Sequence, residues 1–230
     1  MSRLILPEMP EIALQLRRSA RARRFSLRVS RIDGQVTLTL PARAREAEAL
    51  AFARSQAEWL RRTLAAMPDV SRPVFGGTIP FEGRQMVLVP GTVRAPKLES
   101  DRLIVAAGED RLGARLEAFF KHCARRRLQA ATEGYAAALG RPFKRITLRD
   151  TRSRWGSCAH DGSLSYSWRL IMAPPGVLDY VAAHEVAHLA EMNHSQAFWD
   201  VVERLRPGYG AERAWLKRHG GALHAIRFRD

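Results

Sequence analysis

Two short stretches near the start of the chain alternate apolar and polar residues. Apolar side chains fall at every second position of residues 25–29 and of residues 36–40, which is the period of a strand with one buried face. Asp33 and Gly34 lie between the stretches, and this pair is typical of a tight hairpin turn. The pattern predicts a β-hairpin with which a sheet begins.

A helical period follows the hairpin. Over residues 45–66 apolar side chains recur at steps of three and four, with no internal glycine or proline. Short strands are then expected at residues 85–89 and 103–105, between glycines and prolines. We therefore expect residues 1–107 to form a β-rich N-terminal domain with one helix. The apolar positions of that helix are Leu50, Ala53, Ala57, Leu60 and Leu64.

The pattern changes at residue 108, where acidic residues open a long proline-free stretch. Residues 109–139 carry an apolar stripe at helical spacing and are predicted to form one long helix. A short β-meander is expected between residues 146 and 170, followed by three helices near residues 175–192, 195–205 and 211–218. The fold class is α+β, with domains at residues 1–107 and 108–230. The stripe consists of Leu112, Leu116, Phe119, Phe120, Cys123 and Leu128.

Composition narrows the class of protein. Hydrophobic residues make up 46% and charged residues 27% of the chain, so a disordered or low-complexity protein is excluded. No apolar run is long enough to cross a bilayer, and the first residues lack the pattern of a signal peptide. We expect a cytoplasmic protein without a membrane partner. Two cysteines, Cys123 and Cys158, cannot make a disulfide framework or a four-thiolate zinc site, and both are interpreted as packing residues.

The chain is strongly basic, with a formal net charge of +15 that comes almost entirely from arginine. Such a charge attracts polyanions, so nucleic acid, nucleotides or another acidic partner would fit. A purely solvating surface would carry the same charge, and the sequence leaves both alternatives open. Short clusters occur at residues 21–24 and 125–127.

The clearest chemical signal is an H-E-x-x-H motif in a predicted helix. His184 and His188 are one helical turn apart, so both imidazoles can bind one zinc ion, and Glu185 can then reach the attacking water. His194 follows Asn193, a residue that tolerates the backbone conformation in which helices often end. A turn there brings His194 to the metal as a third ligand and leaves a fourth position for water or substrate.

Several motifs together resemble the YgjP-like metallopeptidase-domain family, which is related to the SprT-like and WLM groups. They run from Thr151-Arg152-Ser153-Arg154-Trp155-Gly156-Ser157-Cys158 through Trp168-Arg169-Leu170 and Asp179-Tyr180-Val181 to His184-Glu185-Val186-Ala187-His188 and Asn193-His194-Ser195-Gln196-Ala197-Phe198-Trp199. The resemblance implies a zincin-like catalytic half, zinc on His184, His188 and His194, and Glu185 as catalytic acid and base. Two positions depart from the family pattern: Ser167 stands where Asn often precedes Trp-Arg-Leu, and Val186 replaces the usual Leu.

Three arginines near the motif have two interpretations. Arg152, Arg154 and Arg169 could bind a carboxylate or phosphate of the substrate, because guanidinium groups bind both bidentately. They could instead pair with Asp150, Asp161 or Asp179 and brace the sheet, which is the interpretation we favour for at least one of them. Trp155, Trp168, Phe198 and Trp199 are expected to be packing residues, and Glu191 is a candidate for orienting a histidine.

Three functions fit these residues. The first is a zinc-dependent hydrolase of the metallopeptidase type, with Glu185 as general base and a peptide substrate. The second uses the same centre on a nucleotide, such as a nucleoside triphosphate, or on another phosphorylated small molecule. The third is a polyanion-binding protein with a structural metal, which we disfavour because structural zinc sites usually have four protein ligands.

Overall fold

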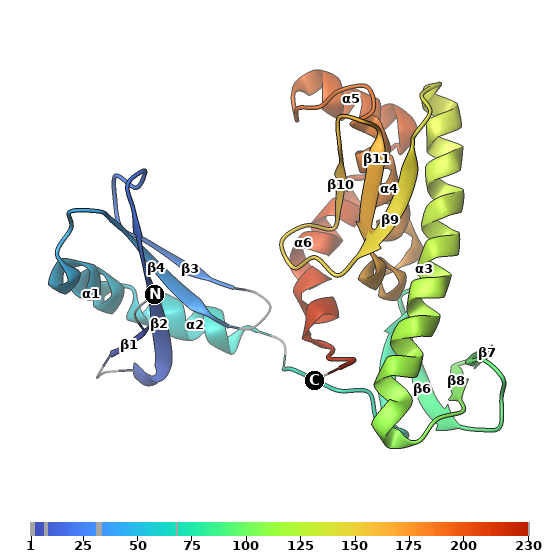
Figure 1. Cartoon of the computed structure of the whole chain (residues 1–230), viewed down its shortest axis with the longest axis horizontal. Helices are drawn as coiled ribbons and strands as arrows, with labels where there is room; N and C mark the ends of the chain where they lie inside the picture. Colours follow the sequence, from blue (N-terminus) through green and yellow to red (C-terminus); the bar gives the residue numbers. More distant parts are fainter. Residues whose placement is uncertain (1–2, 7–8, 31–33, 68, 230) are drawn as a thin grey trace. The chain divides into compact units, whose positions relative to one another are not determined.

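The computed structural model describes residues 3–6, 9–30, 34–67 and 69–229 (Figure 1). The chain forms two compact units, Met1–Asp69 and Val70–Asp230, called here the N-terminal unit and the C-terminal unit. Both combine helices with small mixed sheets, which confirms the α+β class. Within the described ranges, no helix has the length and apolar character needed to span a membrane.

The N-terminal unit contains a four-stranded sheet of order β1-β2-β4-β3. Its strands are β1 (Arg3–Leu6), β2 (Met9–Ser19), β3 (Ser26–Val29) and β4 (Val36–Pro41). β3 and β4 are antiparallel, so the predicted hairpin is confirmed, although Asp33 of its turn lies outside the described residues. β1 and β2 were not predicted individually. β2 has the alternation of a strand with one buried face, because Ile12, Leu14 and Leu16 are buried and face the core.

Two helices, α1 (Glu46–Ser55) and α2 (Ala57–Ala65), cover the apolar face of this sheet. The single helix predicted over residues 45–66 is therefore wrong. Gln56 leaves the helical conformation, with φ −103° and ψ 12°, and the chain bends there. Ala53 and Leu60 of the predicted stripe are buried against the strands, so the apolar period was identified correctly even though the helix is broken.

The C-terminal unit begins with a second four-stranded sheet, of order β5-β6-β8-β7. Its strands are β5 (Thr78–Phe81), β6 (Arg84–Pro90), β7 (Lys97–Glu99) and β8 (Arg102–Val105). Phe81 and Leu88 pack in the same apolar core as Phe120 of the following helix. The compact units consequently divide after residue 69 and not at the predicted position 107/108, because the change in composition at residue 108 falls within one continuous core.

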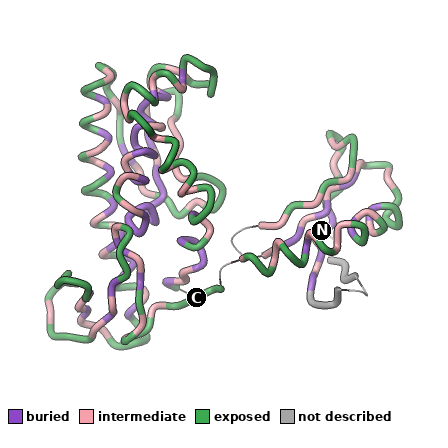
Figure 2. Tube along the Cα trace, turned by 180° about the vertical axis from the view of Figure 1, so that it is seen from behind, coloured by how far each residue is buried: buried purple, intermediate pink, exposed green. Residues whose placement is uncertain are grey.

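The long helix α3 (Glu109–Leu139) is confirmed and runs along the length of the C-terminal unit (Figure 1). Buried and more exposed residues alternate along it, as expected of a helix with one apolar face (Figure 2). At Gly113 the backbone of Phe228 packs directly against α3, because an added Cβ would lie 2.1 Å from the carbonyl oxygen of Phe228. The helix ends at Gly140, which adopts the left-handed conformation with φ 70°.

A three-stranded sheet follows, formed by β9 (Arg145–Arg149), β10 (Gly156–Cys158) and β11 (Ser163–Ser167). β11 lies in the middle, antiparallel to β10 and parallel to β9. The three strands occur where they were predicted, but the sheet is mixed and is not a simple meander. β10 is an edge strand, and the chain continues from β11 into a short 3-10 helix, η1 (Trp168–Met172).

Three helices complete the unit: α4 (Pro175–Ala187), α5 (Gln196–Leu205) and α6 (Gly210–Ala225). α4 lies inside the unit and contacts α3, α5, α6 and β10. Its last residue is Ala187, five residues before the predicted end at residue 192, because the backbone tightens there into turns that bond Leu189 to Val186 and Ala190 to Ala187. α6 continues to Ala225, beyond the predicted end at residue 218.

Candidate metal centre

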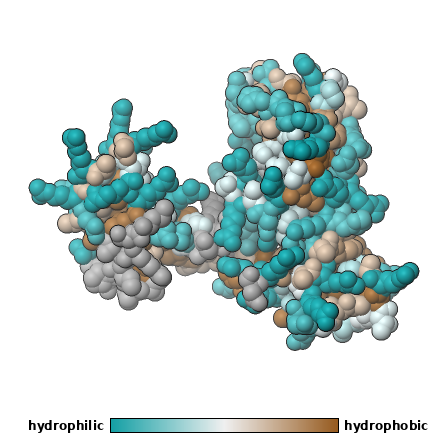
Figure 3. All heavy atoms as spheres, viewed as in Figure 1, coloured by the Kyte–Doolittle hydropathy of each residue, from teal (hydrophilic) through white to brown (hydrophobic). Residues whose placement is uncertain are grey.

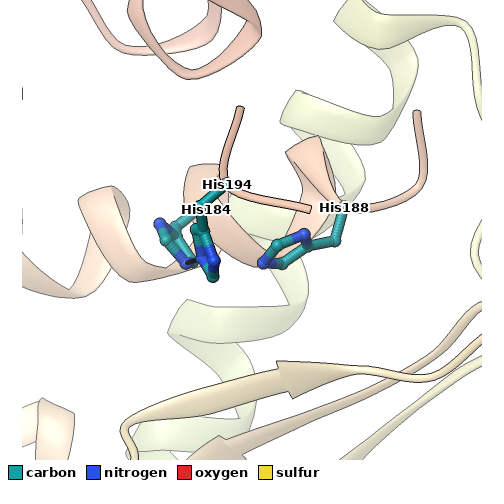
Figure 4. A group of neighbouring side chains, drawn as sticks. All are labelled: His184, His188 and His194. Atoms are coloured by element: carbon teal, nitrogen blue, oxygen red, sulfur yellow. Dashed lines mark hydrogen bonds between the residues drawn. The ribbon is translucent and has the colours of Figure 1, made fainter. Parts of the chain in front are cut away.

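Three histidines from two segments meet at the end of α4. His184 and His188 lie one turn apart on this helix, and His194 comes from the turn that precedes α5. Each offers a ring nitrogen, and these nitrogens all lie within 4.8 Å of one another. Figure 4 shows the rings of His184 and His194 side by side, with the ring of His188 directed toward them.

The spacing of the nitrogens fits a bound metal ion. Nε2 of His184 and Nε2 of His194 are 3.1 Å apart. Two nitrogen ligands at about 2.0 to 2.1 Å from a tetrahedral zinc ion would be separated by about 3.3 Å. The two imidazoles are thus already close to the separation that a shared ion requires.

A backbone contact fixes the tautomer of His188. Its Nδ1 lies 2.9 Å from the carbonyl oxygen of Glu191. A carbonyl can only accept, so Nδ1 must carry the proton and Nε2 must hold the free lone pair. Metal-binding histidines are usually oriented by such a contact on the second nitrogen. Glu191, the residue that the sequence offered for orienting a histidine, makes this contact with its main-chain carbonyl.

Burial keeps two of the histidines, His184 and His188, neutral. Burial, together with the neighbouring His188 and His194, lowers the pKa of His184 to about 3. Burial also lowers the pKa of His188. Because only a neutral imidazole can bind a metal, both ligands are available at neutral pH without losing a proton.

Aromatic rings hold the histidines in place. Phe198 packs against two of them, with ring centroids 4.9 Å from His184 and 4.4 Å from His188. Trp199 lies 5.7 Å from His194 and carries the guanidinium of Arg213 on its face at 4.4 Å. The α5 aromatics are therefore packing residues, as predicted, and they pack against the metal ligands themselves.

The carboxyl group of Glu185 lies against the strand β10. The side chain is 5% exposed, and an added Cβ at Gly156 would lie 2.5 Å from its Oε1. Any larger residue at position 156 would displace the carboxyl group, so this glycine makes room for it. Burial raises the pKa of Glu185 to about 8, and Arg154 acts in the opposite direction. The charge of a bound metal ion would also favour the carboxylate form.

A cavity of about 630 Å³ opens beside these groups. Polar atoms come from Ser153, Arg154 and Ser157, and the apolar wall includes Tyr180, Val181 and Leu216. His184, Glu185, His188 and His194 all line it. The volume suits a substrate of the size of a few amino acids or one nucleotide.

Cys158 also lines this cavity, but its thiol is not part of the histidine cluster. The group of side chains that could hold a metal consists, within the described ranges, of the three histidines. Burial, followed by the charge of Glu185, raises the pKa of Cys158 to about 11. A protonated thiol is a poor ligand, which agrees with a packing role.

The three candidate arginines occupy different environments. Arg154 is exposed and lines the cavity, whereas Arg152 is exposed and lies outside its lining. Arg169 is 8% exposed and bonds Asp150 through Nε at 2.6 Å, and its Nη1 donates to the carbonyls of Leu223 and Ile226. This is the bracing interpretation of the sequence analysis, and it leaves Arg154 as the arginine at the cavity.

Two residues of the cavity wall lie outside the motifs found in the sequence. Leu216 lines the cavity from α6, far from the H-E-x-x-H motif in sequence, and Met192 lines it from the turn after α4. His224 was also missed, and its ring stacks on Trp155 with centroids 4.6 Å apart. No local pattern marks these residues, because tertiary packing alone brings them together.

Comparisons with known proteins identify the family. A family model described as YgjP-like, metallopeptidase domain, matches residues 23–219, which include the three histidines and Glu185. The crystal structure of the metallopeptidase zymogen of Pyrococcus abyssi abylysin is 21% identical, covers 39% of this chain and 93% of that chain, and has a TM-score of 0.36. That similarity is too slight to support an argument. The search of curated proteins found no match.

Proposed function

The chain belongs to the YgjP-like metallopeptidase-domain family, and from this membership we propose that it is a zinc-dependent hydrolase that cleaves peptide bonds. The observation that carries the proposal is the buried carboxyl group of Glu185 beside three convergent histidine nitrogens at one cavity. A structural metal site would leave such a carboxyl group without a task.

Zinc is the metal that we propose. Three imidazoles form the donor set of His184, His188 and His194, and zinc favours nitrogen ligands in a site that keeps one position open. When bound, the ion would supply Lewis-acid polarisation of the scissile carbonyl and lower the pKa of the attacking water. The remaining steps depend on the side chains of the chain itself.

Glu185 is proposed as the general base. Its carboxylate accepts a proton from the attacking water and later donates that proton to the leaving amine. The surrounding burial helps the second half of this cycle, because a carboxyl group with a raised pKa holds the proton until the leaving group takes it. Gly156 leaves the space that this carboxyl group occupies.

The edge strand β10 favours a peptide as the substrate. Gly156, Ser157 and Cys158 line the cavity, and β10 is paired on one side only, with β11. An extended peptide can add to such an edge through main-chain hydrogen bonds and thereby lie beside Glu185. The apolar wall of Tyr180 and Leu216 would then accept an apolar side chain of the peptide.

One observation favours the second candidate, a phosphorylated substrate such as a nucleotide. Arg154 lines the cavity with an exposed guanidinium group, and arginine binds phosphate as well as carboxylate bidentately. The same cavity could hold a nucleoside triphosphate with its phosphates directed to Arg154 and the histidines. Peptide and phosphate hydrolysis would use the same base.

A substrate screen tests both candidates. Zinc-loaded protein would be incubated with a peptide library and with nucleoside triphosphates, and the products would be identified by mass spectrometry. The Glu185→Gln protein is the blank, since contaminating enzymes remain active in it. Cleavage of peptides in the wild type alone supports the first proposal, release of phosphate or pyrophosphate alone supports the second, and equal products in both proteins contradict both.

A further inference from the structure

The sheet of the N-terminal unit has one apolar and one polar face. Leu14, Leu38 and Leu40 point to the apolar face, which α1 and α2 cover. The alternate positions on the other face are polar and more exposed. Across the strands, Arg17 is opposite Thr39 and Thr39 is opposite Ser26, while Gln15, Thr37 and Arg28 form the neighbouring row.

Further arginines lie at the end of this polar face. The loop over residues 20–25 joins β2 to β3, and it must pass the end of β4 because β4 lies between them. Hydrophilic side chains project from this unit in Figure 3. The exposed arginines of the face and its loop are called here the basic face: Arg17, Arg21, Arg23, Arg24 and Arg28.

Within the described residues, the basic face has no neutralising partner. Residues 12–32 contain seven arginines and no aspartate or glutamate. In the described part of the chain, the structure assigns no ion pair or hydrogen bond to the side chains of the basic face. The cluster at residues 125–127 is different, because Arg125 donates to the carbonyl of Ile146 and Arg127 pairs with Glu82. Two arginines of that cluster therefore make internal contacts, whereas the basic face makes none within the described residues.

The distances between the arginines of the basic face favour an extended partner. Arg17 on β2 and Arg28 on β3 are two strands and two residues apart, which places their Cα atoms about 12 Å from each other. A single phosphate group cannot reach both. A polymer with regularly spaced phosphates can, and each neutralised phosphate would release counterions.

We propose that the basic face binds the phosphate backbone of duplex nucleic acid without regard to sequence. Arginine is suited to phosphate, and Gln15, Thr37 and Thr39 add hydrogen-bonding groups of the kind that contact phosphates and sugars. Single-stranded binding would require aromatic side chains for base stacking. The nearby Phe25 stacks instead on Phe52, with centroids 5.8 Å apart, and packs against the core.

The proposal can be tested by fluorescence anisotropy at several salt concentrations. The probes are a labelled DNA duplex of about 20 base pairs and the RNA duplex with the same sequence. The full-length wild type should bind at least one of them, with an affinity that falls steeply as salt rises. In Arg17→Gln/Arg28→Gln protein the slope of log K against log salt should decrease by about two, because each lost phosphate contact lowers it by about one. Replacing Arg21, Arg23 and Arg24 by Gln should lower it by about three.

The matched control is the Arg62→Gln/Arg141→Gln protein. It loses the same two charges from exposed positions outside the basic face, and its binding should match the wild type. Circular dichroism of each variant would check that the unit remains folded. An equal loss of affinity in this control would overturn the proposal in favour of unspecific charge attraction. Absence of duplex binding, with binding to phosphatidylglycerol vesicles in its place, would overturn it in favour of a membrane surface.

Discussion

The N-terminal and C-terminal units share a basic character but offer different side chains for chemistry. Residues 1–69 contain 13 arginines against seven carboxylates, and they contain no histidine or cysteine. All seven histidines lie in the C-terminal unit, where three of them converge beside Glu185. The buried arginine of that unit, Arg169, is fully engaged with Asp150 and with main-chain carbonyls. The N-terminal unit therefore offers charge for binding, whereas the C-terminal unit offers the side chains of the proposed reaction centre.

The largest effect should follow from removing a metal ligand. His194→Ala deletes one of three nitrogens, so zinc affinity should fall by more than about a hundredfold. Metal analysis after gel filtration checks this, with about one zinc per chain expected in the wild type. His160→Ala, which changes an exposed histidine outside the cluster, is the control. Full zinc occupancy in His194→Ala would remove this residue from the ligand set.

A core substitution in the N-terminal unit should destabilise that unit without changing the zinc content of the C-terminal unit. Leu38 is fully buried between two neighbouring strands, so Leu38→Ala should lower the unfolding free energy of that unit by about 2 to 5 kcal/mol. Hydrogen exchange should then rise over residues 12–65, while zinc content remains unchanged. Thr37→Ala, on the polar face of the same strand, is the matched control. Loss of zinc in Leu38→Ala would show that the centre depends on the N-terminal unit.

The pH dependence of stability should include a contribution from His224. Burial lowers its pKa to about 4 in the folded state, so between about pH 6.5 and 4 the unfolded chain binds more protons. Stability therefore falls as pH falls through this window, by up to about 3 kcal/mol from this residue. Denaturant titrations at several pH values should show a shallower decline in His224→Gln and an unchanged one in His160→Gln. A decline equally steep in all three proteins would contradict the burial effect.

The smallest effect should come from the arginine at the cavity. Arg154→Gln removes an exposed guanidinium that lines the cavity, so KM for an anionic substrate should rise by about tenfold with little change in zinc content. The equivalent change at Arg152, outside the lining, should have less effect on KM. Steady-state kinetics with the substrate found in the screen would measure both. A larger rise in KM for Arg152→Gln than for Arg154→Gln would show that Arg152, and not Arg154, binds the substrate.

The sequence predicted the parts of the molecule that depend on local periodicity. His184 and His188 are brought together by one helical turn, and α3 follows from its apolar stripe. The bend at Gln56 and the parallel pairing of β9 with β11 were not predicted, because no local pattern distinguishes them. The same applies to Leu216, which reaches the cavity only through the packing of α6.

The role of Arg169 could not be predicted from the sequence, for a different reason. An arginine in a motif can bind substrate or brace the fold, and its residue type is the same in both cases. Its partners are Asp150, which follows β9, and the carbonyls of Leu223 and Ile226 at the C-terminal end of α6. The choice between the two interpretations therefore required the tertiary structure.

The most direct test is the turnover of Glu185→Gln measured together with its zinc content. The amide fills nearly the same space beside Gly156 but cannot accept a proton from water. We expect zinc content like that of the wild type and a kcat lower by at least about a hundredfold, since general-base catalysis contributes roughly that much or more. Glu133→Gln, an exposed change on α3, should behave like the wild type. A kcat for Glu185→Gln equal to the wild-type value, with zinc retained, would contradict the proposed reaction centre.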